Sequence, residues 1–242
     1  MTPPVVLTIA GSDSGGGSGI QADLRVFAAL RTYGTSVVTA VTAQNTRTIT
    51  DVYPMPGNVV AMQLNAVLED YRVAATKIGM LASAEVASAV TGKARAGALP
   101  NLVVDPVLES SSGRRLGVVS AIERLLPYAT VATPNREEAS ALVGWQVVSP
   151  ADMAGAAGQI AAGGPKYVVI TGGDVAIGDE AVDAVWTEAG ARFLHYPRIS
   201  SRNTQGTGCS FSAAIAARLA LGDGVSDAIL FAKEYVARAI TG

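Results

Sequence analysis

The only cysteine of the chain, Cys209, lies in the glycine-containing segment 203–210, Asn-Thr-Gln-Gly-Thr-Gly-Cys-Ser, which opens an alanine-rich stretch. At the N-terminus of a helix, the amides of Gly206, Thr207 and Gly208 would form an anion hole, because small side chains leave them accessible. The same helix dipole favours a thiolate, so we expect the pKa of Cys209 to lie below its reference value of about 8.5. The alternative is a buried structural cysteine behind a glycine turn.

A second glycine cluster spans residues 11–23 and begins at Gly11, directly after an apolar run. Such glycine density lets a backbone approach a ligand closely. The cluster contains no Gly-Lys-Ser/Thr, and Ile20 stands where a dinucleotide-binding fingerprint needs its third glycine. It is therefore either a ligand-binding loop of another kind or a flexible connection between a strand and a helix.

Three acidic or amide residues follow other apolar runs. Asn135 and Glu138 come just after Thr133-Pro134, and their oxygens could hold water around a magnesium ion. An ordinary helix start, with acids placed against the dipole, explains the same pattern. Asp105 ends a short apolar run before Pro106 and is either a site residue or a turn aspartate.

Two further residues at strand ends could contact a ring. Gln44 carries an amide that can match the donor and acceptor edge of a heterocycle, or it can satisfy loop backbone. Met80, near Lys77, is more typical of a core than of a ligand wall. The single histidine, His195, falls in a predicted hairpin and is expected to be structural or solvated.

Short apolar runs alternate with amphipathic stretches along the whole chain. This alternation predicts an α/β fold, in which a mostly parallel sheet lies between helices on both faces. Ligands of such sheets bind beyond the carboxyl ends of the strands, where the residues above fall. The predicted strands are Val5–Ala10, Ser36–Ala43, Ala75–Met80, Leu102–Asp105, Thr130–Thr133 and Tyr167–Thr171, with a small antiparallel hairpin formed by Ala181–Thr187 and Ala191–Tyr196. The predicted helices are Gly19–Thr32, Val59–Glu69, Ser83–Arg95, Ser120–Leu126, Arg136–Val143, Ala151–Ala162, Gly208–Leu221 and Val225–Ile240.

Composition excludes several classes of protein. The 242 residues are 49% hydrophobic and 16% charged, which excludes a disordered chain. A net charge of -2 gives no reason to expect nucleic acid or a membrane surface as a partner. One cysteine and one histidine exclude an internal disulfide and a Cys/His zinc cluster. Neither a signal peptide nor a membrane span is evident, so we expect one domain, residues 1–242, in the cytoplasm.

Taken together, the motifs resemble those of the ribokinase-like superfamily, and most of all those of bacterial hydroxymethylpyrimidine/phosphomethylpyrimidine kinases. Their order and spacing carry the resemblance, which runs from about Val5 to Ala220. The motifs are Ala10–Gly17 with Gly19–Asp23, Val41–Thr46, Lys77–Leu81, Asp105–Val107, Thr133–Glu138 and Asn203–Cys209.

The resemblance implies a three-layer ribokinase-like fold, usually a homodimer, and a kinase that uses ATP and Mg²⁺. Such enzymes phosphorylate the hydroxymethyl group of 4-amino-5-hydroxymethyl-2-methylpyrimidine and then phosphorylate the monophosphate to the diphosphate, in thiamine biosynthesis. Two alternatives remain: a pyridoxal kinase of the same fold, and a pyrimidine-binding relative without catalysis.

The resemblance also implies roles for individual residues. Cys209 is the implied base beside the anion hole of Gly206, Thr207 and Gly208, because this branch carries cysteine where many sugar kinases carry aspartate. The implied substrate residues are Gly11, Asp23, Gln44, Met80 and Val107. Glu138 and Asn135 would organise magnesium, with Asp105 a weaker candidate for the same network.

The chain departs from this family pattern at several positions. Thr171 stands where a lysine usually lies near the nucleotide phosphates, and Arg202 is the implied replacement for that positive charge. Gln205 stands where histidine is common. Thr171 and the end of the chain at Gly242, earlier than the usual tail of this family, motivate the non-catalytic alternative.

Overall fold

A computed structural model describes residues 2–108, 117–173, 176–177, 180–199 and 205–241 of the chain. Ten strands form one sheet in the order β10-β9-β7-β6-β5-β4-β1-β2-β3, with β8 paired to β9. The six strands from β7 to β2 in this order are parallel to one another, and β3, β8, β9 and β10 pair antiparallel with their neighbours.

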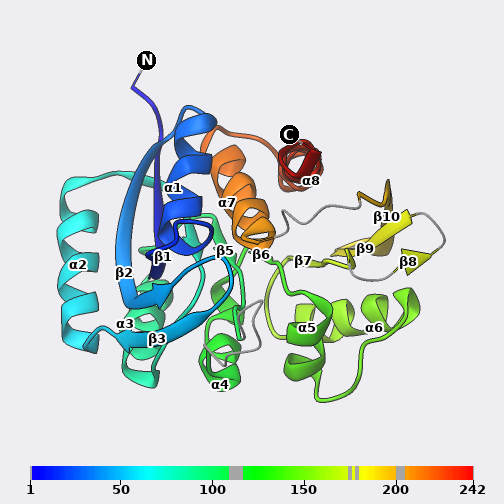
Figure 1. Ribbon diagram of the computed structural model, residues 1–242, viewed down its shortest axis with the longest axis horizontal. Helices are drawn as coiled ribbons and strands as arrows, with labels where there is room; N and C mark the ends of the chain where they lie inside the picture. The colour runs from blue at the N-terminus through cyan, green and yellow to red at the C-terminus, as the bar shows by residue number, and fades with distance from the viewer. Residues whose placement is uncertain (1, 109–116, 174–175, 178–179, 200–204, 242) are drawn as a thin grey trace.

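The strands are β1 (Val5–Asp13), β2 (Tyr33–Gln44), β3 (Ile49–Pro54), β4 (Val73–Ile78), β5 (Leu102–Val104), β6 (Val131–Ala132), β7 (Tyr167–Ile170), β8 (Ala176–Ile177), β9 (Glu180–Thr187) and β10 (Gly190–Pro197). The helices are α1 (Gly19–Ala29), α2 (Gly57–Asp70), α3 (Ala84–Arg95), α4 (Val119–Glu123), α5 (Arg136–Val143), α6 (Pro150–Ala161), α7 (Thr207–Ala220) and α8 (Val225–Thr241), with a 3-10 turn at Leu126–Tyr128. Figure 1 shows this arrangement.

Helices cover both faces of the sheet because side chains alternate along each buried strand. In β1, Leu7 packs in the core under α2 to α6, whereas Val6 packs in the core under α1, α7 and α8. Val104 and Val103 of β5 divide in the same way. The result is the predicted three-layer α/β sandwich.

The predicted hairpin is confirmed, since β9 and β10 pair antiparallel along their whole length. Ser83, the first residue of the predicted helix, is the N-cap of α3, and its side chain accepts a hydrogen bond from the amide of Val86. Two strands were not predicted, β3 and the two-residue β8. Pairing with β3 also extends β2 to Gln44, which is thus the last residue of the strand and does not follow it.

The glycine cluster is only in part a loop. Strand β1 continues through Gly11 and Ser12 to Asp13, because its parallel pairing with β2 resumes after an irregularity between Ala10 and Ser12. The remaining glycines lead into α1, which begins at Gly19 as predicted. Gly11 therefore has a fixed place in the sheet, at the end where a ligand is expected.

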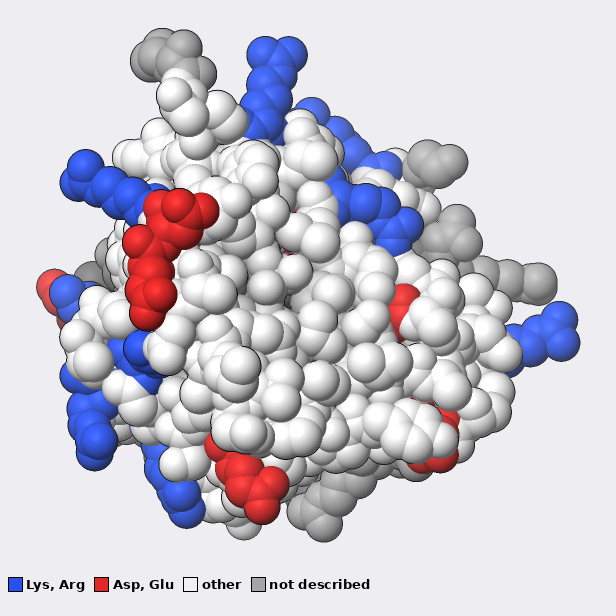
Figure 2. All heavy atoms as spheres, turned by 90° about the vertical axis from the view of Figure 1, so that its left-hand side faces the viewer, with Lys and Arg blue, Asp and Glu red and all other residues white. Residues whose placement is uncertain are grey.

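The face that carries β2 and α2 shows charged side chains of both signs scattered around its margin, with neither sign forming a continuous patch (Figure 2). Among the described residues, no helix is long and apolar enough to span a membrane.

Candidate active site

A cavity of about 590 Å³ lies beyond the carboxyl ends of the parallel strands. Its walls come from the segments that follow β1, β4, β5, β6 and β7, and from the start of α7. The sequence-predicted residues that line it are Gly11, Gln44, Met80, Asp105, Val107, Asn135, Glu138, Thr171, Gly206, Thr207, Gly208 and Cys209. Segments far apart in the chain thus meet where the parallel sheet predicts a ligand.

Helix α7 opens into the cavity through a glycine N-cap. Gly206 has φ +75°, in the left-handed region, and a Cβ there would collide with the carbonyl oxygen of Gly17. No atom would obstruct a Cβ at Gly208, so the space beside this residue is open. The first turn of α7 lines the cavity, where a helix N-terminus favours an anion, and the glycine cluster packs directly against it.

The expectation of a lowered thiol pKa at Cys209 is wrong. Burial raises the pKa of Cys209 to about 12, although the nearby ammonium of Lys77 lowers it. Desolvation disfavours the thiolate more than the positive charge favours it, and the carboxylates of Asp105 and Asp23 add to the rise. Cys209 is therefore a neutral thiol at neutral pH.

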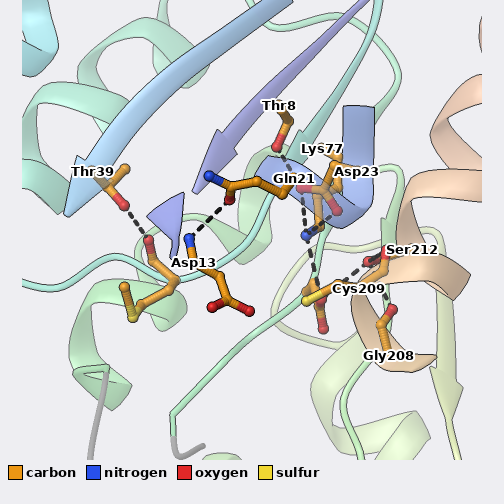
Figure 3. A network of polar contacts seen from close by, with 11 residues as sticks. Thr8, Asp13, Gln21, Asp23, Thr39, Lys77, Gly208, Cys209 and Ser212 are labelled. Atoms are coloured by element: carbon orange, nitrogen blue, oxygen red, sulfur yellow. Dashed lines mark hydrogen bonds and ion pairs between the residues drawn. The ribbon is translucent and has the colours of Figure 1, made fainter. Parts of the chain in front are cut away.

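A fully buried ion pair lies beneath Cys209. The Nζ atom of Lys77, on β4, is 3.0 Å from both carboxylate oxygens of Asp23, on α1. Figure 3 shows these side chains facing each other beside the first turn of α7. Burial lowers the pKa of Lys77, but the neighbouring acidic groups, Asp23 first among them, together outweigh burial, so the pKa lies above its usual range and the lysine stays charged. The hydroxyl of Thr8 donates to Asp23 at 2.6 Å and completes the network.

Asp105 joins this network to the cavity. Its Oδ2 lies 3.6 Å from Nζ of Lys77 and accepts a hydrogen bond of 3.0 Å from Ser212 on α7. It is also hydrogen-bonded to Cys209. Burial raises the pKa of Asp105, and the ammonium of Lys77 opposes that rise. Lys77 thereby holds two buried carboxylates in place, one on each side.

Asn135 and Glu138 form a capping box at the start of α5. The Asn135 side chain accepts from the amide of Glu138 at 2.8 Å, and the Glu138 carboxylate accepts from the amide of Asn135 at 2.9 Å. The helix-start interpretation is thus present in the structure. Burial and, to a smaller extent, the charge of Asp105 raise the pKa of Glu138 to about 8. A cation next to Glu138 would stabilise its ionised form. The position therefore fits both a helix cap and a residue that binds magnesium.

The residues expected around a ring gather on one side of the cavity. Gly11 packs against Met80, whose side chain would collide with any Cβ added at that glycine. The carbonyl oxygen of Met80 accepts a hydrogen bond of 2.7 Å from Thr39 (Figure 3), which holds the chain in place after β4. Gln44 and Val107 complete this side. A flat ring therefore has an apolar wall and an amide at its edge.

One predicted substrate residue, Asp23, lies away from the cavity lining. Asp23 is fully buried and does not line the cavity, because its oxygens are taken by Lys77 and Thr8, so the structure does not bring it to a substrate. Arg202 lies outside the described residues, as do Asn203 and Thr204 of the anion-hole segment. Thr171 lines the cavity after β7, and its amide donates to the carbonyl oxygen of Pro134.

Sequence reasoning missed the role of Lys77. Its position inside a motif was visible, but a lysine at the end of a buried strand carries no signal of which acid it will pair with. The pairing with Asp23 joins residues 54 positions apart. The available signal was the apolar run around Lys77, which predicts a buried position and therefore demands a partner for the charge.

The sheet order, the helices on both faces and the glycine-opened helix at the carboxyl edge define a kinase of the ribokinase-like class. The chain belongs to the phosphomethylpyrimidine kinase family, whose model matches residues 13–242.

Individual relatives agree with this assignment. The chain is 47% identical over 245 residues to a hydroxymethylpyrimidine/phosphomethylpyrimidine kinase of Streptomyces coelicolor, covering 100% of this chain and 90% of that one. It is similar to the crystal structure of a phosphomethylpyrimidine kinase from Clostridium difficile, with 39% identity, a TM-score of 0.84 and coverage of 98% and 99%. A Staphylococcus aureus pyridoxal kinase in complex with AMP-PCP and pyridoxal is also similar, with 36% identity, a TM-score of 0.90 and coverage of 99% and 88%.

Proposed function

We propose that the chain transfers the γ-phosphoryl group of ATP to the hydroxymethyl oxygen of 4-amino-5-hydroxymethyl-2-methylpyrimidine, and then a second one to the resulting monophosphate. The reaction belongs to thiamine biosynthesis. One observation supports it above all: a single cavity is lined by the first turn of α7, by Cys209 and by a side that ends at Gln44.

In this proposal the amides of Gly206, Thr207 and Gly208 bind the phosphoryl group during transfer. Charge spreads over the oxygens of that group in the transition state, so fixed N–H donors lower the barrier. Thr171 lines the cavity, and we assign it, together with Arg202, to the nucleotide. The pocket therefore positions the two reactants and supplies little covalent chemistry of its own.

Cys209 is the proposed base. Because its thiol is protonated, it accepts the substrate's hydroxyl proton only as its own proton leaves toward Asp105, to which it is hydrogen-bonded. The new bond joins the hydroxymethyl oxygen to phosphorus, the bond from phosphorus to ADP breaks, and the proton ends on Asp105. A loose transition state requires this proton to leave late, so a weak base suffices.

Glu138 and Asn135, with Asp105 nearby, are the proposed magnesium residues. Oxygen donors are what Mg²⁺ prefers, and it usually keeps several waters and binds substrate phosphates as well. Within the described residues, no cluster of three or more His, Cys, Asp or Glu side chains would hold a metal alone, which agrees with an ion held mainly by phosphate and water. Magnesium would supply neutralisation of phosphate charge.

The test is a turnover assay with ATP, Mg²⁺ and the pyrimidine, followed by separation of the mono- and diphosphate. We expect both products, and Cys209→Ala should lower turnover about 100-fold or more, the usual effect of a positioned base. Cys209→Ser is the matched control, because it keeps the size and the hydrogen bond to Asp105. Absence of any phosphorylated product with the wild-type chain overturns the proposal. Near-normal turnover of Cys209→Ala would return that residue to a structural role.

Pyridoxal phosphorylation is the second candidate, since the Staphylococcus aureus structure with a TM-score of 0.90 holds pyridoxal. Competition of the two substrates in one assay decides between them, because the ratio of kcat/KM values defines preference. Calorimetry that shows tight pyrimidine binding without nucleotide binding or turnover would instead identify a non-catalytic relative. A homodimer is also proposed, and sedimentation equilibrium tests it.

A further inference from the structure

The side-chain amide of Gln44 is held at both ends. Its Nε2 donates to the hydroxyl of Ser18 at 3.4 Å, and its Oε1 accepts from the hydroxyl of Thr42 at 3.2 Å. An amide has unlike ends, one that donates and one that accepts. The two orientations of the Gln44 amide would therefore present opposite polarities to a ring.

Asp13 decides between these orientations. Its carboxylate, buried at the end of β1, accepts from the amide of Gly15 at 2.8 Å, and from the amide and the hydroxyl of Ser18 at 2.8 and 2.9 Å. A carboxylate only accepts, so the single hydroxyl hydrogen of Ser18 points to Asp13. The Ser18 oxygen can then only accept from Gln44, which directs the nitrogen end of the amide toward it.

Thr42 is compatible with this orientation. Its hydroxyl lies 3.0 Å from the carbonyl oxygen of Ser12 and 3.2 Å from Oε1 of Gln44, and its hydrogen is shared between these two acceptors. Thr42 is buried on β2, two residues from Gln44, so the oxygen end of the amide stays close to the sheet. The orientation of the Gln44 amide is thus set by two linked hydrogen bonds, from Ser18 to the Asp13 carboxylate and from Gln44 to Ser18.

We propose that Asp13 and Ser18 are positioning residues that fix the polarity of the Gln44 amide, and thereby select a ring edge with an acceptor nitrogen next to an exocyclic donor. This inference rests on the proposed function and concerns how its substrate is chosen. After the bonds to Ser18 and Thr42, one N–H and one lone pair of Gln44 are left for a ligand. They match the ring nitrogen and the amino group of a 4-aminopyrimidine.

The reversed ring edge gives a direct test. The 4-oxo analogue of the substrate has nearly the same shape, but its ring N–H donates and its exocyclic oxygen accepts. If the Gln44 amide is fixed, its N–H faces the ring N–H of the analogue and its oxygen faces the exocyclic oxygen, so neither hydrogen bond can form. If the amide is free, it can rotate by half a turn and form both bonds. The quantity to measure is the kcat/KM ratio of the 4-amino substrate to the 4-oxo analogue.

Ser18→Ala removes the acceptor that fixes the nitrogen end. Ser18 precedes α1 without a side-chain cap bond, so the helix start does not depend on its hydroxyl. We expect the kcat/KM ratio to fall about tenfold, mainly through a rise in KM for the 4-amino substrate and a fall in KM for the 4-oxo analogue. A general loosening of the site would raise both KM values and leave the ratio unchanged.

Ser14→Ala is the matched control. The Ser14 hydroxyl bonds the backbone carbonyl and amide of Gln44, at 2.7 and 2.9 Å, and makes no bond to its side chain. The ratio should stay at the wild-type value in Ser14→Ala. An unchanged ratio in Ser18→Ala, or an equal fall in both variants, would overturn the inference.

A failure of the positioning role can be distinguished from a failure of the proposed function. If the wild-type chain phosphorylates neither ring, the proposed function fails, and calorimetric affinities of the two rings for the wild type, Ser18→Ala and Ser14→Ala still report the polarity of Gln44. If the wild type is active and only the ratio test fails, the function stands and the positioning role is removed.

Discussion

Replacement of Lys77 by methionine tests how the buried ion pair stabilises the fold. The substitution removes the ammonium and keeps most of the side-chain volume, so it creates no large cavity. It leaves Asp23 fully buried without its cation and deprives Asp105 of the charge 3.6 Å away. Breaking one side of a buried pair costs more than the pair itself contributes, because an uncompensated charge stays inside.

The expected loss is large. At 3.0 Å, with an effective dielectric constant of about 20, the attraction between Nζ and one carboxylate oxygen is roughly 5 kcal/mol. This agrees with the loss of about 3–5 kcal/mol found when one partner of a buried pair is removed. For a chain of this length, each kcal/mol corresponds to about 2–4 °C, so Tm should fall by roughly 6–20 °C.

The loss should depend on pH in a defined direction. Burial raises the pKa of Asp23, and without Lys77 nothing of opposite charge opposes that rise. A folded-state pKa above the unfolded value of about 3.9 means that the folded state binds more protons, so stability falls as pH rises between the two values. The free energy of unfolding that Lys77→Met loses relative to the wild type should therefore be smallest near pH 4 and grow toward neutral pH.

Urea unfolding followed by circular dichroism, from pH 4 to pH 8, measures these quantities. Arg238→Met is the control, because Arg238 and Glu234 form an exposed i,i+4 pair on α8, and its loss should cost less than about 0.5 kcal/mol. Lys77→Met combined with Asp23→Asn should regain at least half of the loss, since the neutral amide still accepts from Thr8. A deficit below about 1 kcal/mol that does not change with pH would refute the reasoning.

Three smaller predictions concern helix starts. Because burial raises the pKa of Glu138 to about 8, the wild type should lose stability as pH rises from about 4.5 to 8. Glu138→Gln, which keeps the capping box, should lose less stability over this range and be more stable than the wild type at pH 8, and a wild-type slope in the variant would contradict this. Gly206→Ala should weaken ATP binding in calorimetry, because its Cβ displaces the carbonyl of Gly17 from the start of α7; unchanged affinity would show that this turn does not bind phosphate. Ser83→Ala should cost about 1 kcal/mol in urea unfolding through loss of the α3 cap, and no loss would mean that the cap is replaced.

The layers of the fold were predictable because hydrophobic periodicity reports burial directly. Helix α5 was predicted at its observed bounds, Arg136–Val143, since a capping box and a terminal glycine mark both ends. Strand β3 was missed because Ile49–Pro54 is an edge strand with only one neighbour, half exposed and ending in proline. Its apolar signal is therefore weak.

The site was predictable as a set of strand ends, but its electrostatics were not. Local spacing correctly placed Cys209 in the first turn of α7, and local reasoning about the dipole then gave the wrong direction for its pKa. The pKa is set by burial and by charges from other elements, which a one-dimensional pattern does not contain. The same holds for Asp23, whose partners Thr8 and Lys77 come from two different strands.

The protonated state of Cys209 also bears on how the protein withstands oxidants. Peroxides and electrophiles attack thiolates, and a thiol with a pKa of about 12 is almost never ionised at neutral pH. As this is the only sulfhydryl in the chain, the protein has no other thiol with which Cys209 could form an internal disulfide. The high pKa of Cys209 thus predicts that this thiol reacts slowly with peroxides at neutral pH, although it lines the cavity.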